Sequence, residues 1–291
     1  MAGHHLVLGK LVDFIKGVTL EDTHDERYRQ KIARILVAEK GFEKTDIDPR
    51  LKLRVAAGDK RAVVIIDFVV KPVDPICMII KYGPGSIVTS PVTVSGIADP
   101  TFEQTLVVRI LLTDNTVLAL EPTIIQADLG ERGRYSVDVP FQVESTTQGF
   151  IQVFAESARD GGITHLSTMG VALAPSGPET IVPGQFLPEQ IWIQSPVLGQ
   201  TVSGGVVRVQ GFALASFEQT LVIDVYDASG NLVGSKPTMT HAPDLGLPGP
   251  FDDTVSYIVG STGPGRIVVR DPSVAFVGDY HIASVEITLE P

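Results

Sequence analysis

The sequence has only one cysteine, Cys77, and one tryptophan. A single cysteine excludes a disulfide within the chain and a zinc site built from cysteines alone. No segment reaches the roughly 18 uninterrupted apolar residues that a membrane-spanning helix needs, so no membrane span is expected. Lys10, Asp13 and Lys16 interrupt the partly apolar residues 5–19, so a secretory signal is not expected there. The expectation is then that the protein either stays in the cytoplasm or has an export signal that is not on this chain.

Positive charge is scarce after residue 81. Residues 1–81 hold 15 of the 23 Lys and Arg and 12 of the 34 Asp and Glu, a net charge of +3. The remaining residues hold 8 Lys and Arg and 22 Asp and Glu, a net charge of -14. An acidic surface repels the phosphate backbone, so nucleic acid is not expected as a partner of this larger part.

Two helices are predicted near the N-terminus. Leu11, Phe14 and Ile15 are spaced to share one helix face. A second helix is predicted to begin at Thr23, which forms a capping box with Glu26 three residues later. The positions that continue this helix, up to a C-terminal cap, are Tyr28, Ile32, Ile35, Leu36 and Gly41.

Strands are predicted after the helices. Apolar and basic residues alternate from Leu51 to Arg54, a period of two that indicates a strand. Gly58-Asp59 predicts a turn, and residues 62–70 and 76–80 predict two further strands. The fold class expected for the whole chain is mixed: a small α+β module followed by two all-β sandwiches.

The sandwiches are predicted from an internal repeat. Phe102-Glu-Gln-Thr-Leu106 recurs as Phe217-Glu-Gln-Thr-Leu221, 115 residues later. Residues 92–98 also match 207–213, and residues 165–173 match 281–289. An ungapped identity with flanking matches indicates a duplication, with a separate core in each copy. We expect Phe102 and Phe217 to be buried in these cores, and Ala174-Pro-Ser-Gly-Pro178 to begin a linker.

The repeat also carries a family resemblance. Ile191-Trp-Ile-Gln-Ser-Pro-Val197, Val207-Arg-Val-Gln-Gly-Phe-Ala213 and Phe217-Glu-Gln-Thr-Leu221 resemble the immunoglobulin-like domain of bacterial spore germination proteins, the Gmad2 family. The resemblance implies a non-enzymatic binding or spacing module on envelope or secreted proteins. It implies no particular ligand.

The N-terminal part resembles a second family. His24-Asp-Glu-Arg-Tyr-Arg-Gln30, Leu36-Val-Ala-Glu-Lys-Gly-Phe42, Ile65-Ile-Asp-Phe-Val-Val70 and Met78-Ile-Ile-Lys-Tyr-Gly-Pro-Gly-Ser86 are similar to the N-terminal domain of type I restriction enzyme R subunits. That resemblance implies a metal-dependent nuclease, in which carboxylates hold Mg²⁺ and a Lys assists. By position, Glu26 is the helix carboxylate, Asp67 the first strand carboxylate and Lys81 the Lys of a Glu-x-Lys pair.

The nuclease pattern is broken at one position. Ile79 stands where the Glu of the Glu-x-Lys pair is expected, and Ig-like sequence begins after Ser86. We therefore expect a truncated, inactive nuclease segment, with Glu26, Asp67 and Lys81 as vestiges only. No catalytic residue, metal site or cofactor is predicted.

Ordinary structural roles explain the same residues. Asp67 suits a strand end satisfied by a turn, and Glu26 suits a helix N-terminus, where a carboxylate stabilises the dipole. Lys81 suits a solvated strand end. His165 and His281, at equivalent repeat positions, suit structural or surface roles, because no further metal ligands are evident nearby.

The predicted organisation has four segments: an α+β module over residues 1–85, a sandwich over 86–174, a linker over 175–189 and a second sandwich over 190–291. The predicted function is a non-enzymatic binding or structural protein of the bacterial cell envelope or exterior, with a role in sporulation or germination implied by the resemblance. Its partner would be an unidentified protein or cell-wall ligand. The alternative is a DNA-associated protein with a degenerate nuclease domain. The acidic charge favours the first hypothesis, and the missing secretory signal favours the second.

Overall fold

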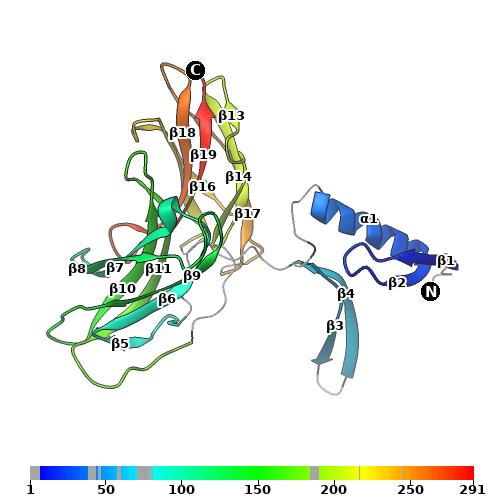
Figure 1. The fold of residues 1–291 in the computed structure, drawn as a ribbon, viewed down its shortest axis with the longest axis horizontal. Helices are drawn as coiled ribbons and strands as arrows, with labels where there is room; N and C mark the ends of the chain where they lie inside the picture. Colours follow the sequence, from blue (N-terminus) through cyan, green and yellow to red (C-terminus); the bar gives the residue numbers. More distant parts are fainter. Residues whose placement is uncertain are drawn as a thin grey trace. The chain divides into compact units, whose positions relative to one another are not determined.

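The computed structural model describes residues 7–38, 44, 47–57, 60–70, 79, 81–183, 190–215, 217–244 and 246–291. The chain divides into two compact units, Met1–Val73 and Asp74–Pro291 (Figure 1). This division precedes the boundary expected at residue 85, because Ile79 and Tyr82 are buried in the first sandwich. The mixed fold, with a small helix-containing part followed by β sandwiches, is confirmed.

The N-terminal unit starts with an antiparallel strand pair, β1 (Val7–Val12) and β2 (Thr19–Thr23). The helix predicted from Leu11 and Phe14 is therefore wrong. The Asp13 carboxylate accepts hydrogen bonds from the backbone N–H groups of Ile15, at 2.9 Å, and Lys16, at 2.7 Å. These bonds close a turn directly after β1, so the chain reverses into β2 instead of winding into a helix.

The second predicted helix is present as α1 (His24–Ala38). Thr23 caps it, because the Thr23 Oγ1 accepts a hydrogen bond of 3.1 Å from the backbone N–H of Glu26. Two of its buried residues are polar, however: Glu26 and Gln30 are each 5% exposed and lie with the buried Ala33, whereas Tyr28 is 62% exposed. The predicted cap at Gly41 lies outside the described residues.

Two longer strands follow, β3 (Ile47–Ala57) and β4 (Lys60–Val70), paired antiparallel with Leu51 opposite Ile66. The alternation of apolar and basic residues thus predicted β3 correctly. The Gly58-Asp59 turn lies outside the described residues, as does the strand predicted over 76–80 except for Ile79.

The second unit consists of two sandwiches of similar topology. The strands of the first sandwich are β5 (Ile87–Thr89), β6 (Val92–Ala98), β7 (Thr105–Leu112), β8 (Val117–Ile124), β9 (Gly133–Val139), β10 (Thr147–Glu156) and β11 (Ile163–Ala174). Those of the second are β12 (Ile191–Ser195), β13 (Thr201–Val202), β14 (Val206–Ala213), β15 (Thr220–Tyr226), β16 (Leu232–Met239), β17 (Gly249–Ser256), β18 (Gly263–Pro272) and β19 (Asp279–Leu289). In each sandwich the larger sheet, β8-β7-β10-β11 or β16-β15-β18-β19, faces a smaller one, β6-β9 or β12-β14-β17.

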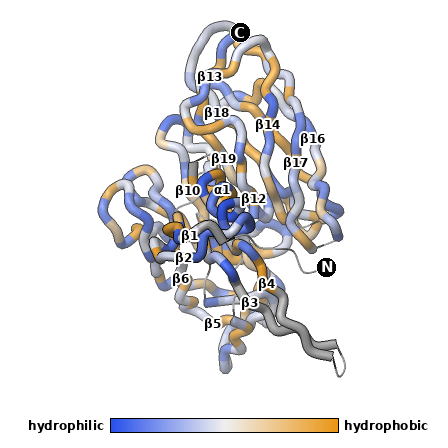
Figure 2. The backbone as a smooth tube through the Cα atoms, turned by 90° about the vertical axis from the view of Figure 1, so that its right-hand side faces the viewer, coloured by the Kyte–Doolittle hydropathy of each residue, from blue (hydrophilic) through white to orange (hydrophobic). Residues whose placement is uncertain are grey.

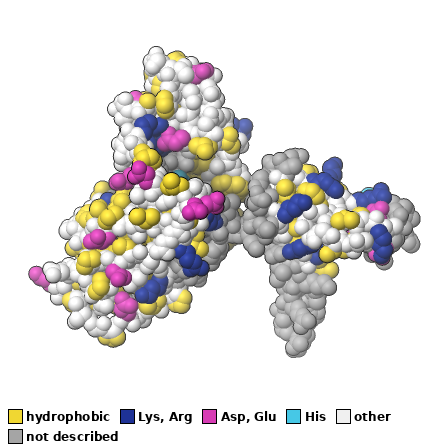
Figure 3. All heavy atoms as spheres, in the orientation of Figure 1, with side chains coloured by type: hydrophobic (Ala, Val, Ile, Leu, Met, Phe, Trp, Pro, Cys, Tyr) yellow, Lys and Arg dark blue, Asp and Glu magenta, His cyan; other side chains and the backbone are white. Residues whose placement is uncertain are grey.

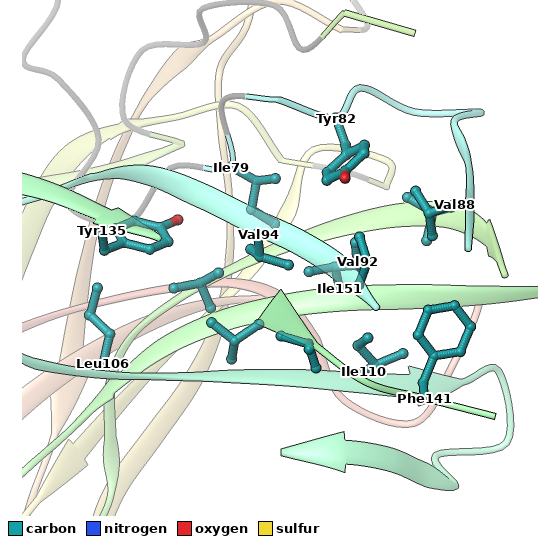
Figure 4. Close-up of a cluster of buried hydrophobic side chains, with 14 of the residues drawn as sticks. Ile79, Tyr82, Val88, Val92, Val94, Leu106, Ile110, Tyr135, Phe141 and Ile151 are labelled. Carbon is teal, nitrogen blue, oxygen red and sulfur yellow. The ribbon is translucent and has the colours of Figure 1, made fainter. Parts of the chain in front are cut away.

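Each sandwich has its own hydrophobic core, as the repeat predicted. Hydrophobic and hydrophilic residues alternate along the strands (Figure 2), so one side of each strand is buried. In the first core, Val94, Ile110 and Ile151 pack together with Ile79 (Figure 4). The second core is separate and includes Leu221, among others.

The two larger sheets join into one ten-stranded sheet. Strand β11 pairs antiparallel with β19, with Leu166 opposite Ile282. These two residues occupy equivalent repeat positions, since residues 165–173 align with 281–289. An approximate two-fold axis therefore passes between Leu166 and Ile282. The two sandwiches are therefore joined through a shared sheet as well as through the linker.

The two-fold axis relates two hairpins that cross the junction. The β10–β11 hairpin of the first sandwich places Asp160 against Arg266 of the second, with Oδ1 and Oδ2 at 2.8 and 2.9 Å from Nη2. Both side chains are almost fully buried, at 6% and 3% exposed. Burial alone would raise the pKa of Asp160, but hydrogen bonds from Arg266 and the Gly162 N–H lower it to about 2.

The equivalent hairpin of the second sandwich makes an apolar contact. Phe276, which aligns with Asp160, lies against Phe150, which aligns with Arg266. The two ring centroids are 4.4 Å apart, and the Tyr280 ring meets both rings nearly edge-on. Equivalent places in the two repeats therefore hold an ion pair on one side of the axis and an aromatic cluster on the other.

The predicted burial of Phe102 and Phe217 is wrong: they are 59% and 40% exposed. The residues that follow each Phe, such as Gln104 at φ 57°, are in the left-handed region and turn the Phe side chain outward. Gln104 points inward instead, and its Nε2 donates to the carbonyl oxygens of Asp128 and Glu131, at 2.8 and 2.9 Å.

The first part of the predicted linker packs on the first sandwich. Ile87 and Thr180 form a β-bridge with N–H···O bonds of 2.8 and 3.0 Å in both directions. The Gly83 N–H donates to the carbonyl of Val182 at 2.7 Å, where an added Cβ on Gly83 would clash with Pro183. Residues 184–189 of the linker lie outside the described part.

Burial predicts which motif residues stabilise the sandwiches. Leu106→Ala should lower the free energy of unfolding by about 2–5 kcal/mol, because it leaves a cavity in a closed core. Phe102→Ala should change it by less than about 1 kcal/mol, because the ring is mostly in solvent. Urea denaturation measures both, and equal losses for the two variants would contradict the assignment of Leu106 to the core.

The joined sheet predicts that the sandwiches stay together when the linker is cut. After cleavage at a protease site inserted between Pro183 and Gln190, the two pieces should co-elute in gel filtration. The double variant Asp160→Ala, Phe276→Ala removes the buried ion pair and the aromatic contact, and it should weaken the association of the two pieces. Separation of the unmodified pieces would show that the β11–β19 junction contributes little.

Candidate functional site

The N-terminal unit gathers the predicted nuclease carboxylates around arginine side chains. Glu26, on α1, accepts hydrogen bonds from Gln30 Nε2 at 2.8 Å, from Arg29 Nη1 at 3.4 Å and from Arg50 Nη2. Arg50 adopts φ 61°, an uncommon backbone conformation for a non-glycine residue, as β3 brings it to α1. Glu26 is therefore held by three partners and does more than favour the helix dipole.

Asp13 belongs to the same cluster and was missed by the sequence analysis. It is 2% exposed, and its Oδ2 accepts hydrogen bonds from Arg50 Nη2 at 3.1 Å and Gln30 Nε2 at 3.2 Å. The sequence predicted a helix here with Leu11, Phe14 and Ile15 on its buried face. On such a helix Asp13 would lie outside that face and be exposed, so its burial was not expected. The i, i+4 spacing of Glu26 and Gln30 was the available signal for a polar buried face.

Asp67 lies on β4 and reaches the cluster through Arg29. The Arg29 Nε donates to Asp67 Oδ1 at 2.5 Å, while Nη1 contacts Glu26. The structure thus brings Glu26 and Asp67 to one arginine. The Asp67 side chain is 56% exposed, and its partner is that arginine side chain and not the turn expected from its strand position.

Lys81 and Ile79 belong to the second unit. The Lys81 Nζ lies 5.0 Å from the ring centroid of Tyr82. Ile79 is 4% exposed and packs in the first sandwich core, so a glutamate at this position would bury a charge among apolar side chains.

The arginines set the charge state of the buried carboxylates. Burial raises the pKa of Glu26, but hydrogen bonds from Arg50 and Gln30 outweigh it and hold the pKa below its ordinary value. Asp13 behaves in the same way, with backbone N–H groups adding to the effect. Both groups are therefore ionised at neutral pH and neutralised by guanidinium groups.

The donor set does not fit a Mg²⁺ centre. Guanidinium groups occupy the space between Glu26, Asp13 and Asp67, where a nuclease would place its metal ion, and a cation repels Mg²⁺. Within the described part of the chain, no group of three or more His, Cys, Asp and Glu side chains could hold a metal.

The repeat histidines flank the β11–β19 junction. His281 stands opposite Ser167 in that strand pair. Burial lowers the pKa of both His165 and His281 to about 4, so both rings are neutral at neutral pH. This placement agrees with the structural role expected for them.

The carboxylate cluster predicts a pH-dependent effect of one arginine. Arg50→Gln should lower the stability of the N-terminal unit by about 3 kcal/mol at neutral pH, because Asp13 and Glu26 would stay buried with less counter-charge. The loss should shrink as the pH falls below the ordinary carboxyl pKa values of 3.8 and 4.5, since protonated carboxyls need no arginine.

Urea titration followed by the helical circular dichroism of α1 measures this loss. Arg27→Gln is the matched control, because Arg27 pairs with Asp22 and is itself 57% exposed. Equal losses for the two variants would contradict the central role of Arg50.

Comparison with known protein families gives two matches. The model of Gmad2, the immunoglobulin-like domain of bacterial spore germination, matches residues 83–162 and 190–275. The model of the type I restriction enzyme R protein N terminus (HSDR_N) matches residues 24–116. Both predicted resemblances are confirmed. The second match runs on into strands β5, β6 and β7, which belong to the first sandwich.

Comparisons with individual proteins add little. No curated protein matches the chain. A crystal structure of red sea bream transglutaminase matches 73% of this chain at 9% identity, with a TM-score of 0.28 that is too low to support an argument. This chain covers 31% of that transglutaminase chain. The two immunoglobulin-like matches together span more than half of the 291 residues, and the chain belongs to the Gmad2 family of immunoglobulin-like domains of bacterial spore germination.

Proposed function

We propose that this chain is a non-enzymatic binding protein of the bacterial cell envelope or exterior, with the tandem sandwiches as its binding part. The observation that carries the proposal is the joined sheet: β11–β19 pairing and two crossing hairpins hold the sandwiches in one orientation. Fixed orientation favours recognition, because less conformational freedom is lost when a ligand binds.

Surface charge argues against DNA as the partner. On the face that Figure 3 shows, acidic side chains are spread over the tandem sandwiches. The net charge of -14 after residue 81 opposes contact with phosphate backbones. No helix within the described ranges is long and apolar enough to cross a membrane.

The neutralised carboxylates support a non-enzymatic role. Arg29 and Arg50 occupy the positions around Glu26 and Asp67 that a catalytic metal would need. The N-terminal unit then retains the nuclease framework as a structural part. The family description, an immunoglobulin-like domain of bacterial spore germination, supports a role in germination as part of this function.

Two assays with the full chain test this function. Purified protein should co-sediment with purified bacterial cell-wall sacculi, and it should not cleave plasmid DNA in Mg²⁺ or Mn²⁺. Absence from the sacculus pellet would count against a cell-wall ligand.

Plasmid cleavage would favour the alternative, a DNA-associated protein, if it disappears in Asp67→Ala. Asp22→Ala is the matched control for that variant, because Asp22 lies on the same unit and pairs with Arg27 outside the carboxylate cluster. Cleavage lost in both variants would point to unfolding instead of a catalytic Asp67.

A further inference from the structure

A cavity of about 210 Å³ lies at the junction of the two sandwiches. Its apolar lining comes from both of them and includes Ile163, Leu166, Phe276 and Ile282. Pockets for drug-sized ligands are larger, roughly 300–1,000 Å³. The junction cavity therefore suits one small molecule or a single residue of a longer chain.

Arg109, on β7, lines this cavity. Its Nε donates to Gln152 Oε1 at 2.9 Å, and its Nη2 donates to the same oxygen. Its guanidinium carbon lies 5.0 Å from the ring centroid of Phe154. Among the residues that the structure describes, Arg109 forms no ion pair with a carboxylate, and its Nη1 makes no hydrogen bond.

This arrangement leaves a partly buried positive charge that has no carboxylate partner among the described residues. Burial lowers the pKa of Arg109, and the charge of Glu156 offsets only part of that effect. A guanidinium stays protonated in proteins, so the charge persists at neutral pH. The partner oxygen of Gln152 is a neutral acceptor and does not cancel it.

A chain of hydrogen bonds fixes the orientation of Gln152. Its Nε2 donates to Thr168 Oγ1 at 3.0 Å, and that hydroxyl lies 3.5 Å from the carbonyl oxygen of Asp279. Gln152 and Thr168 are 1% and 5% exposed. Because the amide nitrogen is engaged, its oxygen must face Arg109, and the Nη1–Nη2 end of the guanidinium is left for a ligand.

In the second repeat, the position equivalent to Arg109 holds a charged side chain that has a partner of opposite charge. Asp224 aligns with Arg109 at the 115-residue offset. Its carboxylate accepts a hydrogen bond of 2.7 Å from Arg270 Nε and another from Ser235 Oγ. The charge at this position is therefore paired within the second repeat and left without a carboxylate partner in the first.

Asp279 limits what the cavity accepts. It lines the same cavity and contacts Arg270 at 3.3 Å, yet burial raises the pKa of Asp279 above its ordinary value. A second negative charge on a ligand would meet this carboxylate. The cavity therefore favours one anionic group on an otherwise apolar body.

We infer that the junction cavity binds a monocarboxylate with an apolar body, whose carboxylate pairs end-on with Nη1 and Nη2 of Arg109. Two parallel N–H···O bonds to a planar carboxylate match the guanidinium geometry. This inference rests on the proposed binding role of the tandem sandwiches and names the chemistry of one ligand. The carboxylate could belong to a free small acid or to the C-terminal residue of a peptide.

Isothermal titration calorimetry with the full chain tests the inference. N-acetyl-leucine should bind, and N-acetyl-leucinamide, which lacks the charge, should bind at least about tenfold more weakly. Arg109→Gln should weaken N-acetyl-leucine binding by a similar factor. Arg208→Gln is the matched control, because Arg208 is 63% exposed on β14 and pairs with Asp252.

Acetyl-Gly-Gly-Leu with a free carboxylate separates the two ligand sources. Tighter binding of this peptide than of N-acetyl-leucine indicates a chain terminus, and binding of N-acetyl-leucine alone indicates a free acid. Absent heat with the acid at two temperatures, equal binding of acid and amide, or an unchanged affinity in a folded Arg109→Gln would each overturn the inference. The acid–amide comparison needs no variant and holds even if Arg109→Gln does not fold.

The sacculus assay keeps this result separate from the proposed function. Sacculus binding without N-acetyl-leucine binding would overturn the carboxylate site and leave the proposed function standing. N-acetyl-leucine binding without sacculus binding would leave the carboxylate site standing and count against a cell-wall ligand.

Discussion

The pairing of β11 with β19 is the contact on which the larger unit depends. It joins two sandwiches at equivalent residues, Leu166 and Ile282, and so imposes an approximate two-fold relation on everything around it. A two-residue strand pair is too short to hold two domains by itself. The hairpins that cross the axis supply the rest, through the buried Asp160–Arg266 pair and the Phe150–Phe276 contact.

These two hairpin contacts illustrate how a duplicated interface diverges. A symmetric interface between identical copies would hold the same pair twice. Here one site is ionic and the other aromatic, and replacing Asp160 alone by the Phe of the equivalent position would leave the buried Arg266 with less counter-charge. This asymmetry favours one arrangement of the two repeats. It also gives the junction cavity both polar and aromatic lining, because Phe276 of the second hairpin and Arg109 of the first sandwich both line it.

The charged side chains of the two units have different kinds of partner. In the N-terminal unit, each buried carboxylate has an arginine partner, so Glu26 and Asp13 are stable as anions without a metal. At the sandwich junction, Arg109 has a hydrogen-bonded amide instead of a counter-charge. The first arrangement closes a site to cations, and the second leaves a site open to an anion.

Local patterns in the sequence predicted the features that depend on neighbouring residues. Thr23 and the residues after it predicted α1, alternation predicted β3, and the repeated Phe-Glu-Gln-Thr-Leu motif predicted two sandwiches with equivalent cores. The charge and the two family resemblances were also evident from the sequence. The exposure of Phe102 was not, because Gln104, in the left-handed turn after it, bonds to carbonyl oxygens 24 and 27 residues further along the chain.

Contacts between distant segments were decided only by the tertiary structure. Arg29 joins Glu26 to Asp67, which lies 38 residues after Arg29, and Arg266 pairs with Asp160 across 106 residues. Whether Arg109 has a counter-charge likewise depends on which side chains β10, β11 and the β18–β19 hairpin bring to it. Charge pairing is set by distance in space and by burial, and a linear pattern of residue types specifies neither.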